Sequence, residues 1–186
     1  MPNIDTPNGF TPLRHLGGGL IRTQMFAIAS AYAADIYAGA PVILSSGKVN
    51  VAAENSAAIL GIFAGCSYVD SSGNQVFRPS WATGTVTQGS ADATAYVYAD
   101  PAISYKVQTD TGTAFTAAMV GSSYDVEADG TDHTGSHITG RSKAELDCGD
   151  TGTGQFTVVG LVNEPGNAVG VNALVEVINN VPVIGN

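Results

Sequence analysis

The residues of this chain with the clearest metal-binding pattern lie between Asp125 and Asp132. The run DVEADGTD places carboxylates at alternate positions before a glycine, as in the first half of a calcium-binding EF-hand loop. The twelfth position of that loop is Ser136, where a bidentate glutamate is required, and no helical pattern flanks the run. We therefore interpret it as an acidic surface turn and predict no metal site.

Two histidines follow this run, His133 and His137, with three residues between them. On a helix this spacing would place both imidazoles on one face, where they could bind zinc. The intervening Thr-Gly-Ser is a poor helix former, and the sequence indicates no third ligand, so surface histidines are predicted. His15 stands alone near the N-terminus.

Nucleophilic catalysis has no strong candidate. Cys66 ends an apolar run, where burial would raise the pKa of a thiol instead of activating it. The chain has no G-x-S-x-G, and Gly152-Thr153-Gly154 lacks the Lys-Ser/Thr of a phosphate-binding loop. We predict no enzyme activity and no cofactor. Cys66 and Cys148 favour two small buried side chains, and their sequence positions leave open whether they form a disulfide.

The charge content restricts the class of partner. The net charge is −9, and no two of the seven basic residues are adjacent, which argues against nucleic acid and against an anionic membrane surface. Charged residues make up 12% of the chain, whereas about a quarter is usual. This scarcity indicates that part of the surface is covered by partners. Without a signal-peptide pattern or a long apolar span, we expect the chain to fold in a cytoplasm.

Short β-forming runs separated by Gly-rich turns predict an all-β fold, a barrel or sandwich with at most one or two short helices. Asp100-Pro101 marks a turn or bulge within residues 95–107, and that run is expected to share one core with residues 156–162 and 171–178. Gly61 and Gly65, inside an apolar run, predict a bulge or a close backbone approach. Other strands are predicted near residues 23–38, 42–44, 49–51 and 57–68, and a short helix near 117–120.

Residues 1–22 read as an extended arm that precedes a single β-rich domain of residues 23–186. Pro2, Pro7 and Pro12 disfavour a helix and a central strand. Spaced apolar residues, including Phe10, nevertheless indicate a segment that docks instead of a free tail. The surface on which it docks is either its own domain or a neighbouring subunit.

Several phrases of this chain resemble small structural proteins of tailed bacteriophages, usually taken to be head decoration or cement proteins. The phrases, which span about residues 8–179, are NGFTPLRHLGGG, GAPVIL, AAILGIFAGCSY, AYVYADPAISYKVQTD, TGRSKAELD and VVGLVNEPGNAVGVNALVEVIN. The resemblance implies a compact β-barrel or β-tulip domain with an N-terminal arm. It also implies a homotrimer on the outer capsid surface of the virion, clamping neighbouring copies of the major capsid protein.

The resemblance supplies no binding motif, so the interface is predicted from the arm itself. Phe10, Leu13 and Leu16 would bury apolar area against the capsid, and Arg14 and Arg22 would meet carboxylates of the coat protein.

Two other functions remain open. A glycan-binding module could stack sugars on Trp81, Tyr96, Tyr98 and Tyr105, although alternation favours these aromatic residues as core or interface. A tail or fibre component would share the same composition.

Overall fold

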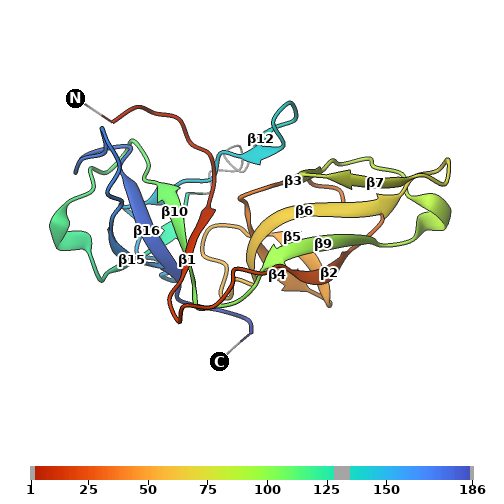
Figure 1. The fold of residues 1–186 in the computed structure, drawn as a ribbon, viewed down its shortest axis with the longest axis horizontal. Coiled ribbons are helices and arrows are strands. Elements are labelled where there is room, and N and C mark those ends of the chain that lie inside the picture. The colour runs from red at the N-terminus through yellow and green to blue at the C-terminus, as the bar shows by residue number, and fades with distance from the viewer. Residues whose placement is uncertain (1–2, 128–134, 185–186) are drawn as a thin grey trace.

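Two β-sheets fill two lobes that lie side by side along the long axis of the molecule (Figure 1). The computed structural model describes residues 3–127 and 135–184. Nearly all regular structure there is strand, which confirms the predicted all-β class. Two short 3₁₀ turns are the exceptions, η1 (Gln88–Ser90) and η2 (Ala117–Met119), and η2 lies within the predicted short helix.

The first lobe is a closed barrel of five strands, and a barrel is one of the two architectures that the sequence predicted. These strands are β2 (Gln24–Ile28), β4 (Pro41–Ser45), β5 (Lys48–Val51), β6 (Gly61–Val69) and β9 (Ala93–Tyr98). They pair in the order β4-β5-β2-β9-β6, and β6 then pairs with β4 to close the ring. β7 (Gln75–Arg78) pairs with the far half of β6 as a hairpin outside the ring.

Two glycines of β6 allow a close approach to β9 and a bulge within the strand. A Cβ at Gly61 would overlap the carbonyl oxygen of Tyr98 on β9, so only glycine permits this close approach. The register between β6 and β9 shifts between Phe63 and Gly65, which is a β-bulge. Both predicted features of this run are therefore confirmed, and β6 changes its partner from β4 to β7 beyond the bulge.

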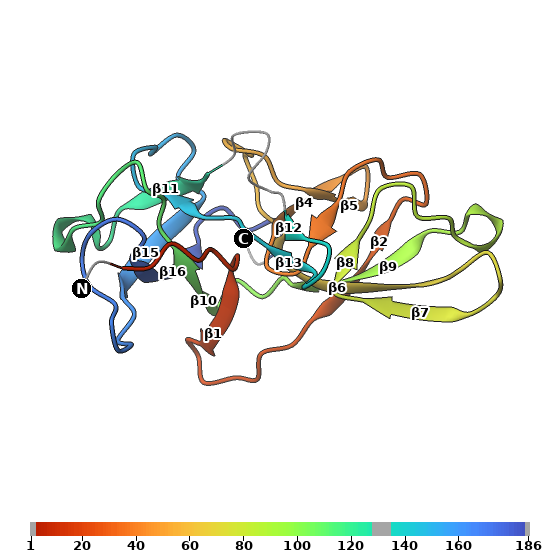
Figure 2. The same ribbon diagram turned by 90° about the horizontal axis from the view of Figure 1, so that it is seen from above.

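The second lobe contains the other six-stranded sheet, in the order β1-β10-β16-β15-β11-β14 (Figure 2). Its strands are β1 (Thr11–His15), β10 (Ile103–Gln108), β11 (Ser123–Val126), β14 (Leu146–Asp147), β15 (Phe156–Leu161) and β16 (Leu174–Asn179). An isolated bridge between Thr109 and Leu146 brings β14 back towards the end of β10.

Two short pairs complete the described strands. β3 (Ile36–Tyr37) pairs with β8 (Ser80–Trp81), and β12 (Gly135–Ser136) pairs with β13 (Arg141–Ser142). A further bridge joins Ala38 to Arg141, which ties the second pair to the first. No helix in the described part of the chain is long and apolar enough to cross a bilayer.

Each lobe has its own hydrophobic cluster. The predicted turn at Asp100-Pro101 is confirmed, but it carries the chain from β9 in the barrel to β10 in the other sheet. Residues 103–107 share one cluster with β15 and β16, as predicted, whereas Ala95 and Val97 of β9 belong to the barrel cluster, so the expected common core is only partly confirmed. Strand spacing predicts where strands occur, and pairing partners depend on contacts far apart in sequence.

The two cysteines belong to different clusters. Cys66 is buried in the barrel cluster, Cys148 is buried in the second cluster, and both are free thiols. Burial raises the pKa of Cys66 to about 11, and burial together with nearby Asp110 raises that of Cys148 to about 12. These thiols act as packing groups.

Candidate partner-binding face

The start of the N-terminal arm is tied to the second lobe by side-chain hydrogen bonds. The Asn3 amide donates to the carbonyl oxygens of Ala168 (2.8 Å) and Val171 (2.9 Å). The backbone N–H of Thr6 donates to the Gln108 side chain (3.1 Å). The sequence left open whether the arm docks on its own domain or on a neighbouring subunit. These bonds dock the start of the arm on its own chain.

The next part of the arm is regular structure. Residues 11–15 form β1, an edge strand that pairs antiparallel with β10, although no regular structure was predicted there. An edge position tolerates Pro12, which cannot donate to a second neighbour. Phe10 is buried, with its ring centroid 4.5 Å from that of Phe156. Of the predicted interface residues, Phe10 is thus a core residue.

The other predicted interface residues on β1 point outward. Leu13 is partly exposed beside the β-bulge between Pro12 and Arg14. The Arg14 side chain forms two hydrogen bonds with Glu176 of β16, at 2.7 and 3.0 Å. Burial raises the pKa of Glu176, but the hydrogen bonds from Arg14 and Ser104 and the charge of Arg14 together outweigh burial, so the net pKa is lowered. Arg14 is therefore engaged within its own chain.

The connector (residues 16–23) leaves the second lobe and crosses to the barrel, and it is organised by His15. The His15 Nδ1 accepts the backbone N–H groups of Gly17 and Gly19, both at 3.1 Å. Because Nδ1 accepts, the ring proton is on Nε2, which donates to Asp100 at 3.2 Å. The ring thus fixes a glycine-rich turn that the sequence alone would leave flexible.

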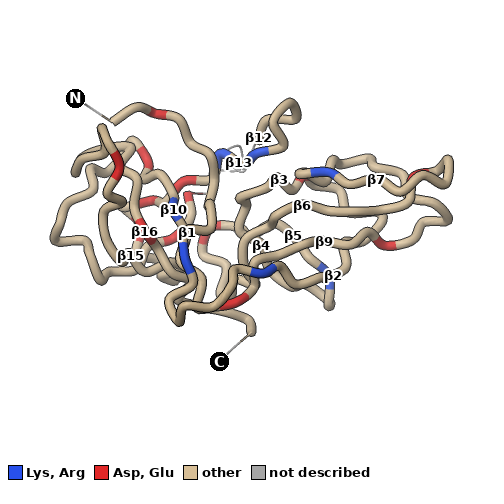
Figure 3. The backbone as a smooth tube through the Cα atoms, viewed as in Figure 1, with Lys and Arg blue, Asp and Glu red and all other residues tan. Residues whose placement is uncertain are grey.

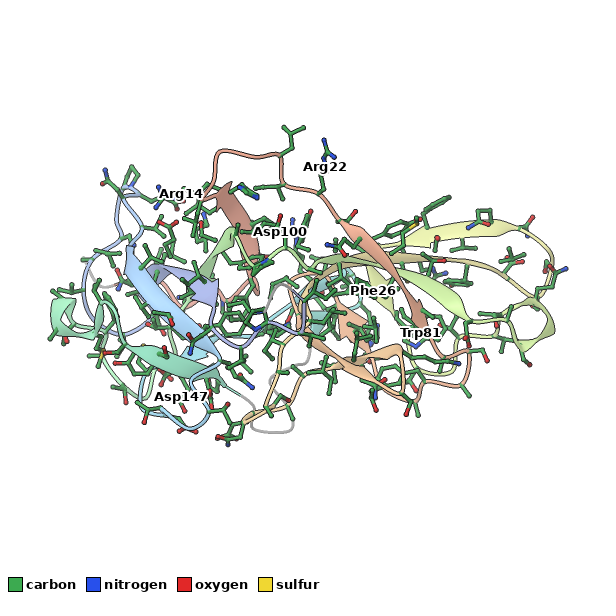
Figure 4. All side chains as sticks on the ribbon, turned by 90° about the horizontal axis from the view of Figure 1, so that it is seen from below. Arg14, Arg22, Phe26, Trp81, Asp100 and Asp147 are labelled. Carbon is green, nitrogen blue, oxygen red and sulfur yellow. The ribbon has the colours of Figure 1, made fainter. Side chains whose placement is uncertain are left out.

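Apolar side chains project from this connector into solvent. Leu16, Leu20 and Ile21 are all exposed, Leu20 to 73%. Arg22 follows them and is exposed as well. Figure 4 shows Arg22 projecting on the same side of the molecule as Arg14. Leu13, Leu16 and Arg22 are therefore the predicted interface residues that the fold leaves free to contact a partner.

The outer surface of the barrel continues this exposed apolar region. Met25 of β2 lies opposite Tyr96 of β9, which lies opposite Gly65 of β6. One strand further, Phe77 of β7 lies opposite Ser67, whose hydroxyl is 3.0 Å from that of Tyr96. Met25 is 72% exposed and Phe77 is 70% exposed. Large apolar side chains at this exposure mark interaction surfaces when they gather together.

A groove of about 590 Å³ lies between β1 and the barrel. Thr11 and Pro12 line one side, and Phe63 and Ala64 line the other. A shallower depression of about 380 Å³ adjoins it between Tyr96 and Phe77, since Ala64 and Pro79 border both. We call the connector, this groove and the outer strip from Met25 to Phe77 the front face.

Three arginines lie on or beside the front face without a carboxylate partner. Arg141 lines the groove, Arg78 lines the adjoining depression, and Arg22 follows Ile21 of the groove wall. Among the described residues, none of the three is in an ion pair, whereas Arg14, Lys48 and Lys106 are. Figure 3 shows how sparse the basic positions are along this acidic chain. Free guanidinium groups are thus concentrated where apolar side chains are exposed.

Carboxylates gather on the other side of the second lobe, where Figure 4 shows Asp147 away from Arg14 and Arg22. A hydrogen bond with Asp150, assisted by burial, raises the pKa of Glu54. Asp125 is fully buried and accepts the backbone N–H groups of Thr153 (2.9 Å) and Gln155 (2.8 Å).

Histidine and carboxylate groups form no metal centre in residues 3–127 and 135–184. Asp132 and His133 of the EF-hand-like and histidine patterns lie outside the described residues. The His137 Nε2 lies 2.8 Å from the Tyr37 hydroxyl. Burial, helped by nearby Asp35, raises the pKa of Tyr37 to about 12.

The aromatic residues considered for sugar stacking divide into two pairs. Trp81 and Tyr105 are buried in separate clusters, which confirms the core interpretation for these two. Tyr96 and Tyr98 are partly exposed along the front face.

Comparisons with protein-family models, with curated proteins and with solved structures found no match to this chain.

Sequence reasoning selected the arm and missed the barrel strip. Met25 and Phe77 lie in short strands whose exposure does not alternate regularly, so no local signal identified them. No sequence pattern predicts that three arginines gather on one face, namely Arg22, Arg78 and Arg141. Their placement depends on the path of the chain between the lobes.

Proposed function

We propose that this protein is a structural virion component that binds the outer surface of a tailed-phage capsid and stabilises the coat lattice. The resemblance of its sequence phrases to decoration proteins supports this assignment. The observation that carries it is the front face, where exposed apolar side chains and unpaired arginines occur together in a chain with few charges. The partner is the major capsid protein, and we propose a homotrimer as the bound form.

The function requires a surface that binds one assembled state. A protein that binds the lattice and not its dissociated subunits stabilises the lattice by mass action. Many copies on one head add their small individual contributions. The connector and barrel strip provide the apolar area, and Arg22, Arg78 and Arg141 provide charge for specificity.

The arm has a different role in this proposal from the one its sequence suggests. Asn3, Thr6, Phe10 and Arg14 hold it on the second lobe. The arm therefore supports the connector instead of reaching to a neighbouring coat subunit. A deletion of residues 1–21 would remove β1 and a core phenylalanine, so loss of capsid binding by that deletion would not identify an interface.

A glycan-binding module remains the rival. With Trp81 and Tyr105 buried, sugar stacking would be restricted to Tyr96 and Tyr98 with Phe77. Stacking on such rings needs accessible ring faces, and a glycan array would show binding that depends on Tyr96 if the rival is correct.

Calorimetric melting of phage heads assembled without this protein tests the proposal. Added protein should raise the melting temperature of the heads, and the rise should continue as the logarithm of protein concentration once sites are filled. Isolated coat subunits should show no equivalent shift. Heads whose melting temperature is unchanged at every protein concentration would refute the proposed function.

A further inference from the structure

The groove on the front face has an unpaired strand edge as one border. β1 pairs with β10 on one side, and no other described strand pairs with it. Thr11 and Pro12 of this strand line the groove. Strand edges of this kind accept extended segments of other proteins, although Pro12 supplies only its carbonyl oxygen.

The opposite border is built from small residues. Ala38, Gly39 and Ala64 line the groove there. Gly39 is held in place because its carbonyl accepts the N–H of Phe10 (2.9 Å) and its N–H donates to Phe63 (2.8 Å). The Phe10–Gly39 bond closes the groove at that end, and beyond it the small side chains of the border leave the groove open beside Thr11 and Pro12.

Among the described residues, no carboxylate forms an ion pair with the arginines around the groove. The carboxylates nearest in sequence to the front face have other partners. Asp100 binds His15, and Asp35 accepts the backbone N–H of Thr83 (2.6 Å) and the hydroxyl of Tyr37 (3.1 Å). Neither Asp100 nor Asp35 forms an ion pair with Arg22, Arg78 or Arg141. Guanidinium groups without an internal partner form their strongest contacts with external carboxylates.

We propose that this groove binds an extended acidic segment of a partner protein, with its carboxylates on Arg22, Arg78 and Arg141. The inference rests on the proposed function, in which the partner is the coat protein. A second copy of this chain is a poorer occupant. Its extended segment, the arm, carries one carboxylate, Asp5, against two arginines, and it is already held on its own lobe through Asn3 and Thr6.

Zero-length cross-linking tests this inference on intact heads. The variants Arg22→Lys, Arg78→Lys and Arg141→Lys keep the charge and introduce an amine that a carbodiimide joins only to a carboxylate in direct contact. Lys48 and Lys106 provide an internal control, because their ion pairs with Asp92 and Glu164 should cross-link within every folded chain. Mass spectrometry locates the linked peptides.

The expected result is a new link from each substituted position to one acidic segment of the coat protein. Heads that bind a variant without any such link would overturn the inference and leave the proposed function standing. Links only between two copies of this chain would overturn it as well, because a second copy would be the occupant.

A second measurement decides the inference if heads are not bound, an outcome that by itself refutes the proposed function. The probes are two fluorescein-labelled extended peptides, one alternating valine with glutamate and one alternating valine with lysine. The glutamate peptide should bind the free protein with an affinity that falls as salt increases and that Arg141→Gln and Arg78→Gln reduce. Equal binding of both peptides, or binding of neither, would overturn the inference.

Discussion

Arg14 and Glu176 form a bidentate ion pair, with Nε 2.7 Å from Oε1 and Nη2 3.0 Å from Oε2. The pair joins β1 to β16 across the intervening β10. A guanidinium expected to bind a coat carboxylate is instead used to hold the arm on its own sheet. The arm is therefore a structural part of the second lobe.

The variant Arg14→Gln should destabilise the protein in a pH-dependent way. The pKa of Glu176 in the folded protein lies below its ordinary value of 4.5. The stabilisation is therefore present above the pKa of the unfolded chain and is lost as pH falls through the lowered pKa of the folded chain. Urea unfolding should show a difference between wild type and variant at neutral pH that shrinks in acid. A difference independent of pH would show that the ion pair is not its source.

Phe10 should be essential for the fold, although it lies in the arm. Its side chain is buried against Phe156, so Phe10→Ala should lower the free energy of unfolding by about 3–5 kcal/mol. Leu13→Ala, in the adjoining strand β1 and 41% exposed, is the control and should cost much less. Equal effects of the two variants in chemical denaturation would mean that the arm is not packed as described.

Gly61→Ala should disturb the closure of the barrel. The new Cβ would overlap the carbonyl oxygen of Tyr98, and relief by backbone movement should cost about 1–3 kcal/mol. Gly160→Ala serves as the matched control, because Gly160 is also in a strand but has open space around its Cβ position. Thermal unfolding compares the two, and an unchanged melting temperature for Gly61→Ala would disprove the close approach.

The two thiols should be unreactive in the folded protein. Burial raises the pKa of both, to about 11 for Cys66 and about 12 for Cys148, and it also blocks access. Ellman's reagent at neutral pH should therefore detect no thiol in the native protein and two in denaturant without reductant. Fewer than two thiols in denaturant would indicate a disulfide, which the separate clusters of these cysteines oppose.

The all-β class, the barrel and the bulge in β6 follow from local patterns. Alternation in residues 93–98 and glycines at positions 61 and 65 act over a few residues, so they can be recognised in one sequence. The division into two sheets could not be predicted, because Asp100-Pro101 looks the same whether it joins strands of one sheet or of two. The role of Arg14 was missed for the same reason, since Glu176 lies 162 residues away.

The front face was only partly predictable. Leu16 and Arg22 were recognised from an arm that needed burial, and the connector does expose them. Phe77 and Met25 join the same face through the pairing of β7, β6, β9 and β2. That strand order is a tertiary property, so no local pattern could place these side chains beside Arg78 and Arg141.

Co-sedimentation with heads that lack this protein tests most directly whether the front face binds the capsid. The double variant Met25→Asp with Phe77→Asp places charge on two residues that are 72% and 70% exposed, so the fold should survive. The control carries Val120→Asp and Val169→Asp, at exposed positions of the second lobe outside the front face. We predict that wild type and control bind saturably with equal affinity, whereas the front-face variant binds at least about tenfold more weakly. Equal binding by the folded front-face variant would contradict the account.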